Sequence, residues 1–150
     1  KQVNTARENG AGESIEAPAG KYICKIEKME LAATKDNRPM FKVQLRIIES
    51  GDNEDGAVAE YLSHFKHKKP CLFMYRVIAG TKNDANMIAS VIGWLEKLGS
   101  SIIPEFHSYS QFAGNILDIY EDIVNDIELE VVYNPNSFNS ISVAEVYDAY

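Results

Sequence analysis

Apolar and polar residues alternate most regularly between Met40 and Ile48. One set of alternate positions carries Phe41, Val43, Leu45 and Ile47, and the other carries Met40, Lys42, Gln44, Arg46 and Ile48. A period of two residues is typical of a β-strand that has one face in the core. The other face of this strand is then expected to present Lys42, Gln44 and Arg46 to solvent.

A second strand-like segment precedes it, over residues 21–31. Neither set of its alternate positions is wholly apolar, so we expect a β-bulge near Glu27 or Lys28 to return the apolar residues to one face. The connection between the two segments contains Asp36-Asn37, a pair suited to a turn with positive φ. The pattern therefore predicts two strands joined by a short turn.

Residues 57–67, AVAEYLSHFKH, are rich in Val, Tyr and Phe and predict a third strand. A helix is predicted over residues 83–99, with Thr81 and Asp84 as a capping pair and Gly99 at its end. Its apolar stripe consists of Ile88, Val91, Ile92, Leu95 and Leu98.

A second helix is expected to follow Ser108, which has Gln111 three residues later. Its apolar stripe consists of Phe112, Ile116, Ile119, Tyr120 and Ile123. Residues 127–133 and 138–148, separated by the turn-forming sequence NPNS, predict a closing β-hairpin.

The predicted order is three strands, two helices and two strands. This order is compatible with a mainly β fold with added helices, in which five strands form a small, partly open barrel and one or two helices lie between strands three and four. Residues 1–19 are polar and lack periodicity, so they are expected to form a flexible arm. Residues 20–150 are expected to form a single domain.

The charges are unevenly divided along the chain, whose formal net charge is −7. Residues 21–82 carry twelve Lys or Arg against eight Asp or Glu, a balance of +4. Residues 83–150 carry one Lys against eleven carboxylates, a balance of −10. Such asymmetry suggests an anionic partner that meets one face of the protein, although chance clustering on solvated surfaces would give the same counts.

Patterns typical of membrane proteins, secreted proteins and enzymes are missing. No apolar run approaches the roughly 18 residues of a membrane span, and the first twenty residues lack the apolar core of a secretory signal. Cys24 and Cys71 form no CxxC pair, so we expect two reduced thiols in a cytoplasmic protein. No GxSxG, HExxH or GxGxxG motif occurs, and neither an enzymatic activity nor a cofactor is predicted.

Two groups of residues contain side chains that can ligate metals. The first consists of His64, His67 and Cys71, and the second consists of Asp118, Asp122 and Asp126. The first would suit zinc, but residues three apart on a strand point to opposite faces, and a fourth ligand is not evident. The second would suit Mg²⁺ in a nuclease, but carboxylates spaced by four along a helix are more commonly a solvated face.

The basic half of the chain has the composition of a surface for single-stranded nucleic acid, which needs cations along the phosphates and flat side chains for the bases. The candidate DNA-binding residues are Tyr22, Lys25, Lys35, Arg38, Lys42, Gln44, Arg46, Tyr61, Phe65, Lys66 and Lys68. The cations on residues 40–48 carry this interpretation, because the apolar positions of that strand already account for its inner face. The alternative for the aromatic residues is that Tyr61, Phe65, Phe73 and Tyr75 all lie in the core.

Residues 20–100 also resemble phage-encoded single-stranded-DNA-binding proteins of replication and recombination modules. In those proteins a Gly-x-Tyr strand leads through a Thr/Ser-Lys-x-Asn/Gly-x-Pro turn into an alternating strand that ends in an acidic residue and Gly. The corresponding residues here are Gly20, Tyr22, Thr34, Lys35, Asn37, Pro39, Glu49 and Gly51, and the helix NMIASVIGWLEKLG follows in order. The chain departs from the resemblance in its overall acidity, and its terminal AEVYDAY is only a modest version of an acidic tail that recruits partners.

The resemblance implies an OB-fold and binding of single-stranded DNA without sequence specificity, in phage DNA replication or recombination in the bacterial cytoplasm. We also expect a homodimer or higher oligomer, with phage replication or recombination proteins as further partners. The alternative is a protein-interaction module on an OB-like scaffold that does not contact DNA, because a fold does not dictate a function.

Overall fold

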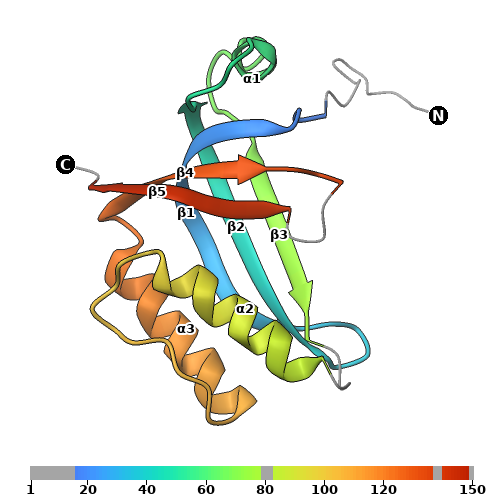
Figure 1. Cartoon of the computed structure of the whole chain (residues 1–150), viewed down its shortest axis with the longest axis vertical. Helices are drawn as coiled ribbons and strands as arrows, with labels where there is room; N and C mark the ends of the chain where they lie inside the picture. The colour runs from blue at the N-terminus through green and yellow to red at the C-terminus, as the bar shows by residue number, and fades with distance from the viewer. Residues whose placement is uncertain (1–15, 79–82, 137–139, 149–150) are drawn as a thin grey trace.

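Five strands form one antiparallel sheet in the order β3-β2-β1-β4-β5 in the computed structural model, which describes residues 16–78, 83–136 and 140–148 (Figure 1). The strands are β1 (Gly20–Ala33), β2 (Pro39–Ser50), β3 (Cys71–Val77), β4 (Ile127–Tyr133) and β5 (Ile141–Asp148). The helices are α1 (Ala57–Leu62), α2 (Asp84–Glu96) and α3 (Tyr109–Ile123).

The predicted faces of β2 are confirmed. Phe41, Val43 and Leu45 are fully buried, and the residues between them are partly exposed. The predicted bulge in β1 is also confirmed: the pairing with β2 passes from Ile26 to Lys28 and leaves Glu27 unpaired. The extra residue shifts the alternation by one position, so that both ends of β1 contribute apolar side chains to the same core.

The turn between β1 and β2 has the predicted backbone. Asn37 has a φ of 63°, and the amide of Thr34 donates to the carbonyl of Arg38 at 2.9 Å. Thr34 Oγ1 also accepts from the amide of Arg38 at 3.0 Å. These bonds hold the turn in a defined conformation at one end of the two long strands.

The prediction of a third strand over residues 57–67 is wrong. Residues 57–62 form α1, because Val58, Tyr61 and Leu62 are spaced as one face of a helix and all three are buried. The third strand is β3, whose Leu72 and Met74 enter the core at alternate positions.

The two longer helices agree with the sequence pattern. Ser108 and Gln111 form the predicted capping box at the start of α3, and Gly99 has a φ of +72° just after α2. Asn83 is the N-cap of α2, and the predicted capping residue Thr81 lies outside the described residues. Both helices lie beside one half of the long strands, and the β4–β5 hairpin crosses the other half (Figure 1).

The fold is mainly β and OB-like, as predicted, with α2 and α3 between the third and fourth strands. β1 is central because it pairs with β2 along most of its length and with β4 over Gly20–Cys24. The sheet does not close into a barrel, and β3 and β5 are its edges. One hydrophobic core contains residues from all five strands and all three helices.

The segment before β1 is only partly described. Residues 16–19, at the end of the predicted flexible arm, contact the domain: Ala17 packs against the core, and the carbonyl of Pro18 accepts a hydrogen bond from the hydroxyl of Tyr22 at 2.5 Å. Residues 1–15 of the predicted arm lie outside the described residues. Among the described residues, no helix has the length and apolar character needed to span a membrane.

Candidate nucleic-acid interface

The side of β1–β3 that points away from the core forms a continuous surface, which we call the outer face. It consists of Lys25, Glu27, Lys28 and Glu30 on β1, Lys42, Gln44 and Arg46 on β2, and Cys71, Phe73 and Tyr75 on β3. The strand register arranges most of these residues in three rows: Lys25-Arg46-Cys71, Lys28-Gln44-Phe73 and Glu30-Lys42-Tyr75. Each row places a cation or an amide of β2 next to a side chain of β3.

Two aromatic side chains of β3 stand exposed on the outer face. Phe73 is 45% exposed and Tyr75 is 52% exposed. They are two residues apart on one strand, and their rings are nearly parallel, with centroids 6.1 Å apart and an interplanar angle of 8°. We call Phe73 and Tyr75 the aromatic pair. Its rings are flat, solvent-accessible surfaces of the kind on which bases stack.

Several cations of the outer face and its adjoining turn lack a carboxylate partner. Within the described part of the chain, Lys25, Lys35 and Lys42 form no ion pair. Other cations are paired: Lys28 Nζ lies 3.3 Å from Glu30, and Arg38 Nε lies 2.9 Å from Asp36. These unpaired lysines, of which Lys25 and Lys35 are exposed and Lys42 is partly exposed, can therefore contact a phosphate without first breaking an ion pair.

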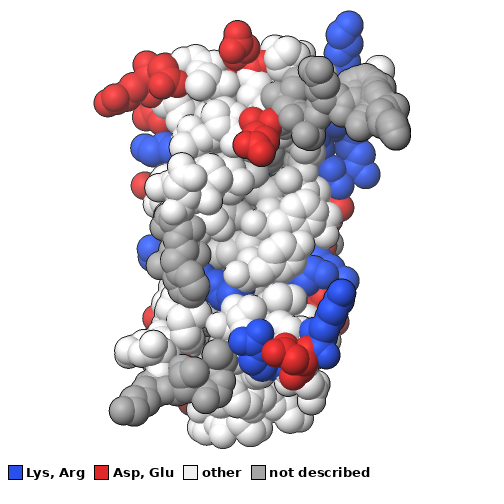
Figure 2. All heavy atoms as spheres, turned by 90° about the vertical axis from the view of Figure 1, so that its right-hand side faces the viewer, with Lys and Arg blue, Asp and Glu red and all other residues white. Residues whose placement is uncertain are grey.

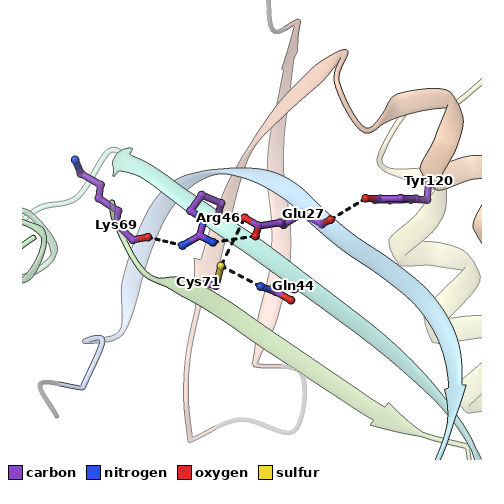
Figure 3. A network of polar contacts seen from close by, with 6 residues as sticks. All are labelled: Glu27, Gln44, Arg46, Lys69, Cys71 and Tyr120. Atoms are coloured by element: carbon purple, nitrogen blue, oxygen red, sulfur yellow. Dashed lines mark hydrogen bonds and ion pairs between the residues drawn. The ribbon is translucent and has the colours of Figure 1, made fainter. Parts of the chain in front are cut away.

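Arg46 is held in place by an extended network of polar contacts (Figure 3). Its Nε and Nη2 donate to the two carboxylate oxygens of Glu27 at 2.7 and 2.8 Å, and its Nη1 donates to the carbonyl of Lys69 at 2.7 Å. The hydrogen bonds from Arg46 hold the pKa of Glu27 below its usual value, with a smaller contribution from the charge of Lys68. The pair thus stays ionised at neutral pH, and Glu27 already occupies much of the guanidinium.

The same network joins the bulged residue of β1 to α3 and to β3. The hydroxyl of Tyr120, on α3, donates to the carbonyl of Glu27 at 2.7 Å, which fixes the bulged residue. On the other side, Gln44 Nε2 lies 3.4 Å from the sulfur of Cys71, and that sulfur lies 3.8 Å from Glu27 Oε2. Arg46 therefore holds Glu27 and the segment before β3 in place, in addition to carrying a positive charge on the outer face.

The structure revises the aromatic residues that the sequence suggested as stacking platforms. Tyr22 is fully buried and Tyr61 is 8% exposed, so neither ring has a face free for a base. Burial also raises the pKa of both hydroxyls above the usual value for tyrosine. Phe65 packs edge-on against Tyr61, with ring centroids 5.2 Å apart, and lies against the core. These rings therefore serve the fold: Tyr22 on β1 and Tyr61 on α1 belong to the core, and Phe65 packs against it.

Lys66 and Lys68 are exposed in the segment between α1 and β3. The hydrogen bond from Arg46 to the carbonyl of Lys69 places this segment next to the outer face. Cations of β1 and β2 thus lie along the outer face, the β1–β2 turn adds Lys35 and Arg38 at one end of it, and the segment before β3 adds Lys66 and Lys68 at the other end. Sequence reasoning missed the aromatic pair because it did not predict β3, although the alternation of Leu72 and Met74 with Phe73 and Tyr75 would have revealed it.

Asp122 on α3, one of the three carboxylates considered for Mg²⁺, takes part in ordinary surface contacts. Asp122 accepts hydrogen bonds from the hydroxyl of Ser100 at 2.7 Å and from the amide of Ser101 at 3.1 Å, and these bonds lower its pKa. Among the residues that the structure describes, no group of three His, Cys, Asp or Glu side chains is arranged to hold a metal ion.

Comparison with known proteins gives no family assignment. The chain matches no protein-family model and no curated protein.

Proposed function

We propose that this protein binds single-stranded DNA without sequence specificity, through the outer face of β1–β3, and that it is not an enzyme. The observation that carries the proposal is the exposed aromatic pair beside a strand with Lys42, Gln44 and Arg46 on the same face. Stacking accepts any base, and lysine contacts to phosphate carry no sequence information, so such a surface favours binding to single strands of any sequence.

The distribution of charge supports the same proposal. The unpaired Lys25, Lys35 and Lys42 lie on or beside the outer face, whereas the eleven carboxylates of residues 83–150 belong to other elements. A single strand that lies along the outer face can place its phosphates near these lysines and its bases against the aromatic pair. A duplex cannot use the pair in this way because its bases are already stacked on each other.

The biological setting follows from the resemblance of residues 20–100 to phage single-stranded-DNA-binding proteins. We propose a role in phage DNA replication or recombination in the cytoplasm of the bacterial host. Assembly into a homodimer or higher oligomer, and contacts with other replication or recombination proteins, belong to the same proposal.

Fluorescence anisotropy with labelled oligo-dT tests the proposed function. Wild-type protein should bind oligo-dT more tightly than a duplex, and the affinity should fall as salt rises because binding releases counterions from the phosphates. Replacing both members of the aromatic pair, Phe73→Ala with Tyr75→Ala, should weaken binding by about 1–3 kcal/mol per stacked base.

Tyr147→Ala is the matched control for this experiment. Tyr147 on β5 is 43% exposed, similar to the aromatic pair, but its neighbours include the carboxylates of Glu130 and Glu145. Its replacement should leave the affinity unchanged. If wild-type protein does not bind oligo-dT at low salt, the proposal fails, and the exposed aromatic pair favours the alternative of a protein-interaction module, since aromatic residues are enriched at protein interfaces.

A further inference from the structure

A pocket of about 360 Å³ opens next to the aromatic pair, at the edge where the sheet fails to close. We call it the edge pocket. Its lining consists of Glu16, Ala17, Tyr61, Cys71, Leu72, Phe73, Tyr133 and Pro135. These residues come from the segment before β1, from α1, from β3 and from the end of β4, so the pocket exists only because the chain brings four distant segments together. Its volume falls in the range of roughly 300–1,000 Å³ that small-molecule sites occupy.

Three of the eight residues that line the edge pocket are aromatic: Tyr61, Phe73 and Tyr133. Tyr133 is partly buried and packs edge-on against Tyr22, with ring centroids 6.0 Å apart. Tyr61 forms another wall and is itself supported by Phe65. Tyr133 is thus backed by a ring of the core, and Tyr61 is backed by a ring that packs against the core.

The polar groups of the edge pocket favour an uncharged ligand with hydrogen-bonding edges. Within the described part of the chain, the hydroxyls of Tyr61 and Tyr133 make no hydrogen bond, and the lining contains the carboxylate of Glu16 but no Lys or Arg. A carboxylate repels phosphate, whereas it accepts hydrogen bonds from the N–H groups that every nucleobase carries.

The surface around the opening agrees with this conclusion. Figure 2 looks onto the side of the molecule where β3 forms the edge of the sheet, and the middle of this side carries neither Lys or Arg nor Asp or Glu. Lys and Arg side chains lie at both margins of the same view, with more of them at the right-hand margin. A single strand can therefore keep its phosphates at the right-hand margin and turn a base toward the uncharged middle.

Phe73 connects the edge pocket to the outer face, because it belongs both to the aromatic pair and to the lining of the pocket. We propose that the edge pocket binds one unstacked base of the single strand that occupies the outer face, between the rings of Phe73 and Tyr133 and against the small part of Tyr61 that stays exposed. This inference rests on the proposed function, since the strand must first lie along the aromatic pair.

Photo-crosslinking of an oligonucleotide that contains 5-iodouracil, followed by mass spectrometry, tests the inference in the wild-type protein. Crosslinks are expected at Tyr133 or Tyr61 in addition to those at Phe73 or Tyr75. A complex that forms and crosslinks only at the aromatic pair would overturn the edge pocket as a base site and leave the proposed function intact. Failure to form any complex would overturn both.

The variant Tyr133→Leu gives an independent readout, because leucine keeps apolar contact with Tyr22 but removes the aromatic wall. Its affinity for oligo-dT should fall about fivefold or more, and by the same factor at every salt concentration because stacking on the ring is not ionic. Tyr147→Leu on β5 is the matched control and should bind as wild type does. An unchanged affinity of Tyr133→Leu, or a change in the salt dependence, would contradict the inference.

A loss of folding in Tyr133→Leu is distinguished by circular dichroism and by thermal unfolding of the free protein. In that case Tyr133→Phe, which keeps the ring and removes only the hydroxyl, takes its place. It should bind more weakly than wild type at every salt concentration if the hydroxyl contacts the base edge. Equal affinity of Tyr133→Phe and wild type, together with no crosslink at Tyr61 or Tyr133, would overturn the inference.

Discussion

The two faces of β2 and β3 both carry aromatic side chains, but these side chains are in opposite environments. On the inner face Phe41 is fully buried and meets the ring of Trp94 edge-on, with centroids 5.7 Å apart. On the outer face Phe73 and Tyr75 are about half exposed, and each contacts the other rather than the core. Packing explains the inner ring completely, whereas no described part of the chain covers the outer pair. The exposed pair is thus the feature that indicates a ligand.

The cations of the two faces differ in the same way. Arg76 on the inner face is 3% exposed, its pKa is lowered by burial, and its Nη1 donates to the hydroxyl of Ser90 at 2.6 Å. Lys25 on the outer face is exposed. A buried cation is fixed by the fold and closed to a ligand, while a solvated lysine can exchange water for phosphate at little cost. The location of a cation on the sheet, rather than the net charge of the chain, decides whether a phosphate can reach it.

The largest difference between the two faces should appear in stability. Phe41→Ala removes a fully buried ring and should lower the free energy of unfolding by about 3–5 kcal/mol. The same substitution on the neighbouring strand, Phe73→Ala, should change it by no more than about 0.5 kcal/mol, because that ring is exposed. Urea denaturation of both variants measures the difference. Similar decreases in the two variants would mean that the outer ring is part of the core.

The inner face could be predicted from sequence because its cause is local. The alternation around Phe41 shows which side of β2 is buried, and the interrupted alternation of β1 shows that a bulge must lie near Glu27. Between β2 and β3 the prediction was wrong because it relied on composition rather than on spacing. A composition rich in Val, Tyr and Phe suggested a strand there, but the spacing of Val58, Tyr61 and Leu62 is helical. Spacing was the better guide, since it reports which residues share a face.

The outer face could be predicted only in part. The cations of β2 followed from its period, but the exposure of Phe73 and Tyr75 depends on what covers β3, which no local pattern reveals. The pairing of Arg46 with Glu27 joins residues 19 positions apart through a bulge, so the sequence could not show that this arginine is already engaged. Tyr22 was misassigned because a tyrosine at the start of a strand has the same local pattern whether it is buried or exposed.

The second prediction concerns charge on the outer face. Lys42→Glu should lower the affinity for oligo-dT about tenfold, and it should reduce the slope of log affinity against log salt by about 0.7 for each phosphate that the variant no longer neutralises. Lys97→Glu, just after α2 on an exposed position away from the outer face, makes the same change in net charge and should have little effect. Anisotropy titrations at several salt concentrations compare the two. Equal effects would show that net charge, not the outer face, governs binding.

The third prediction has the opposite sign. Glu27→Gln removes the negative charge that occupies Arg46 and should raise the affinity for oligo-dT about threefold, since the guanidinium can then contact a phosphate. Glu145→Gln, an exposed carboxylate on β5, is the matched control and should leave the affinity unchanged. A lower affinity in Glu27→Gln would show that the ion pair positions Arg46 for binding rather than competing for it.

The stability of the Glu27 variant provides a check on this interpretation. The Glu27 side chain is 40% exposed and the Arg46 side chain 24%, so solvent partly screens the ion pair, which should contribute no more than about 1 kcal/mol. Because the pKa of Glu27 is lowered in the folded protein, the contribution of the pair is present at neutral pH and is lost as the pH falls through that lowered pKa. Wild type and Glu27→Gln should therefore differ slightly in melting temperature at pH 7 and converge in acid.

The smallest expected effect uses the two cysteines as reporters of the two faces. Cys24 is fully buried, and burial raises its pKa to about 12, so its thiol stays protonated and shielded in the folded protein. Cys71 is partly exposed on the outer face and also lines the edge pocket. In the native protein a thiol reagent should react with Cys71 alone, and with both cysteines after unfolding.

Saturating oligo-dT should slow the reaction of Cys71 severalfold and leave Cys24 unreactive. The variant Cys71→Ser separates the two signals, since its native form should then show no reactive thiol. Reaction of Cys71 at the same rate with and without bound oligo-dT would place the DNA elsewhere on the molecule and contradict the assignment of the outer face.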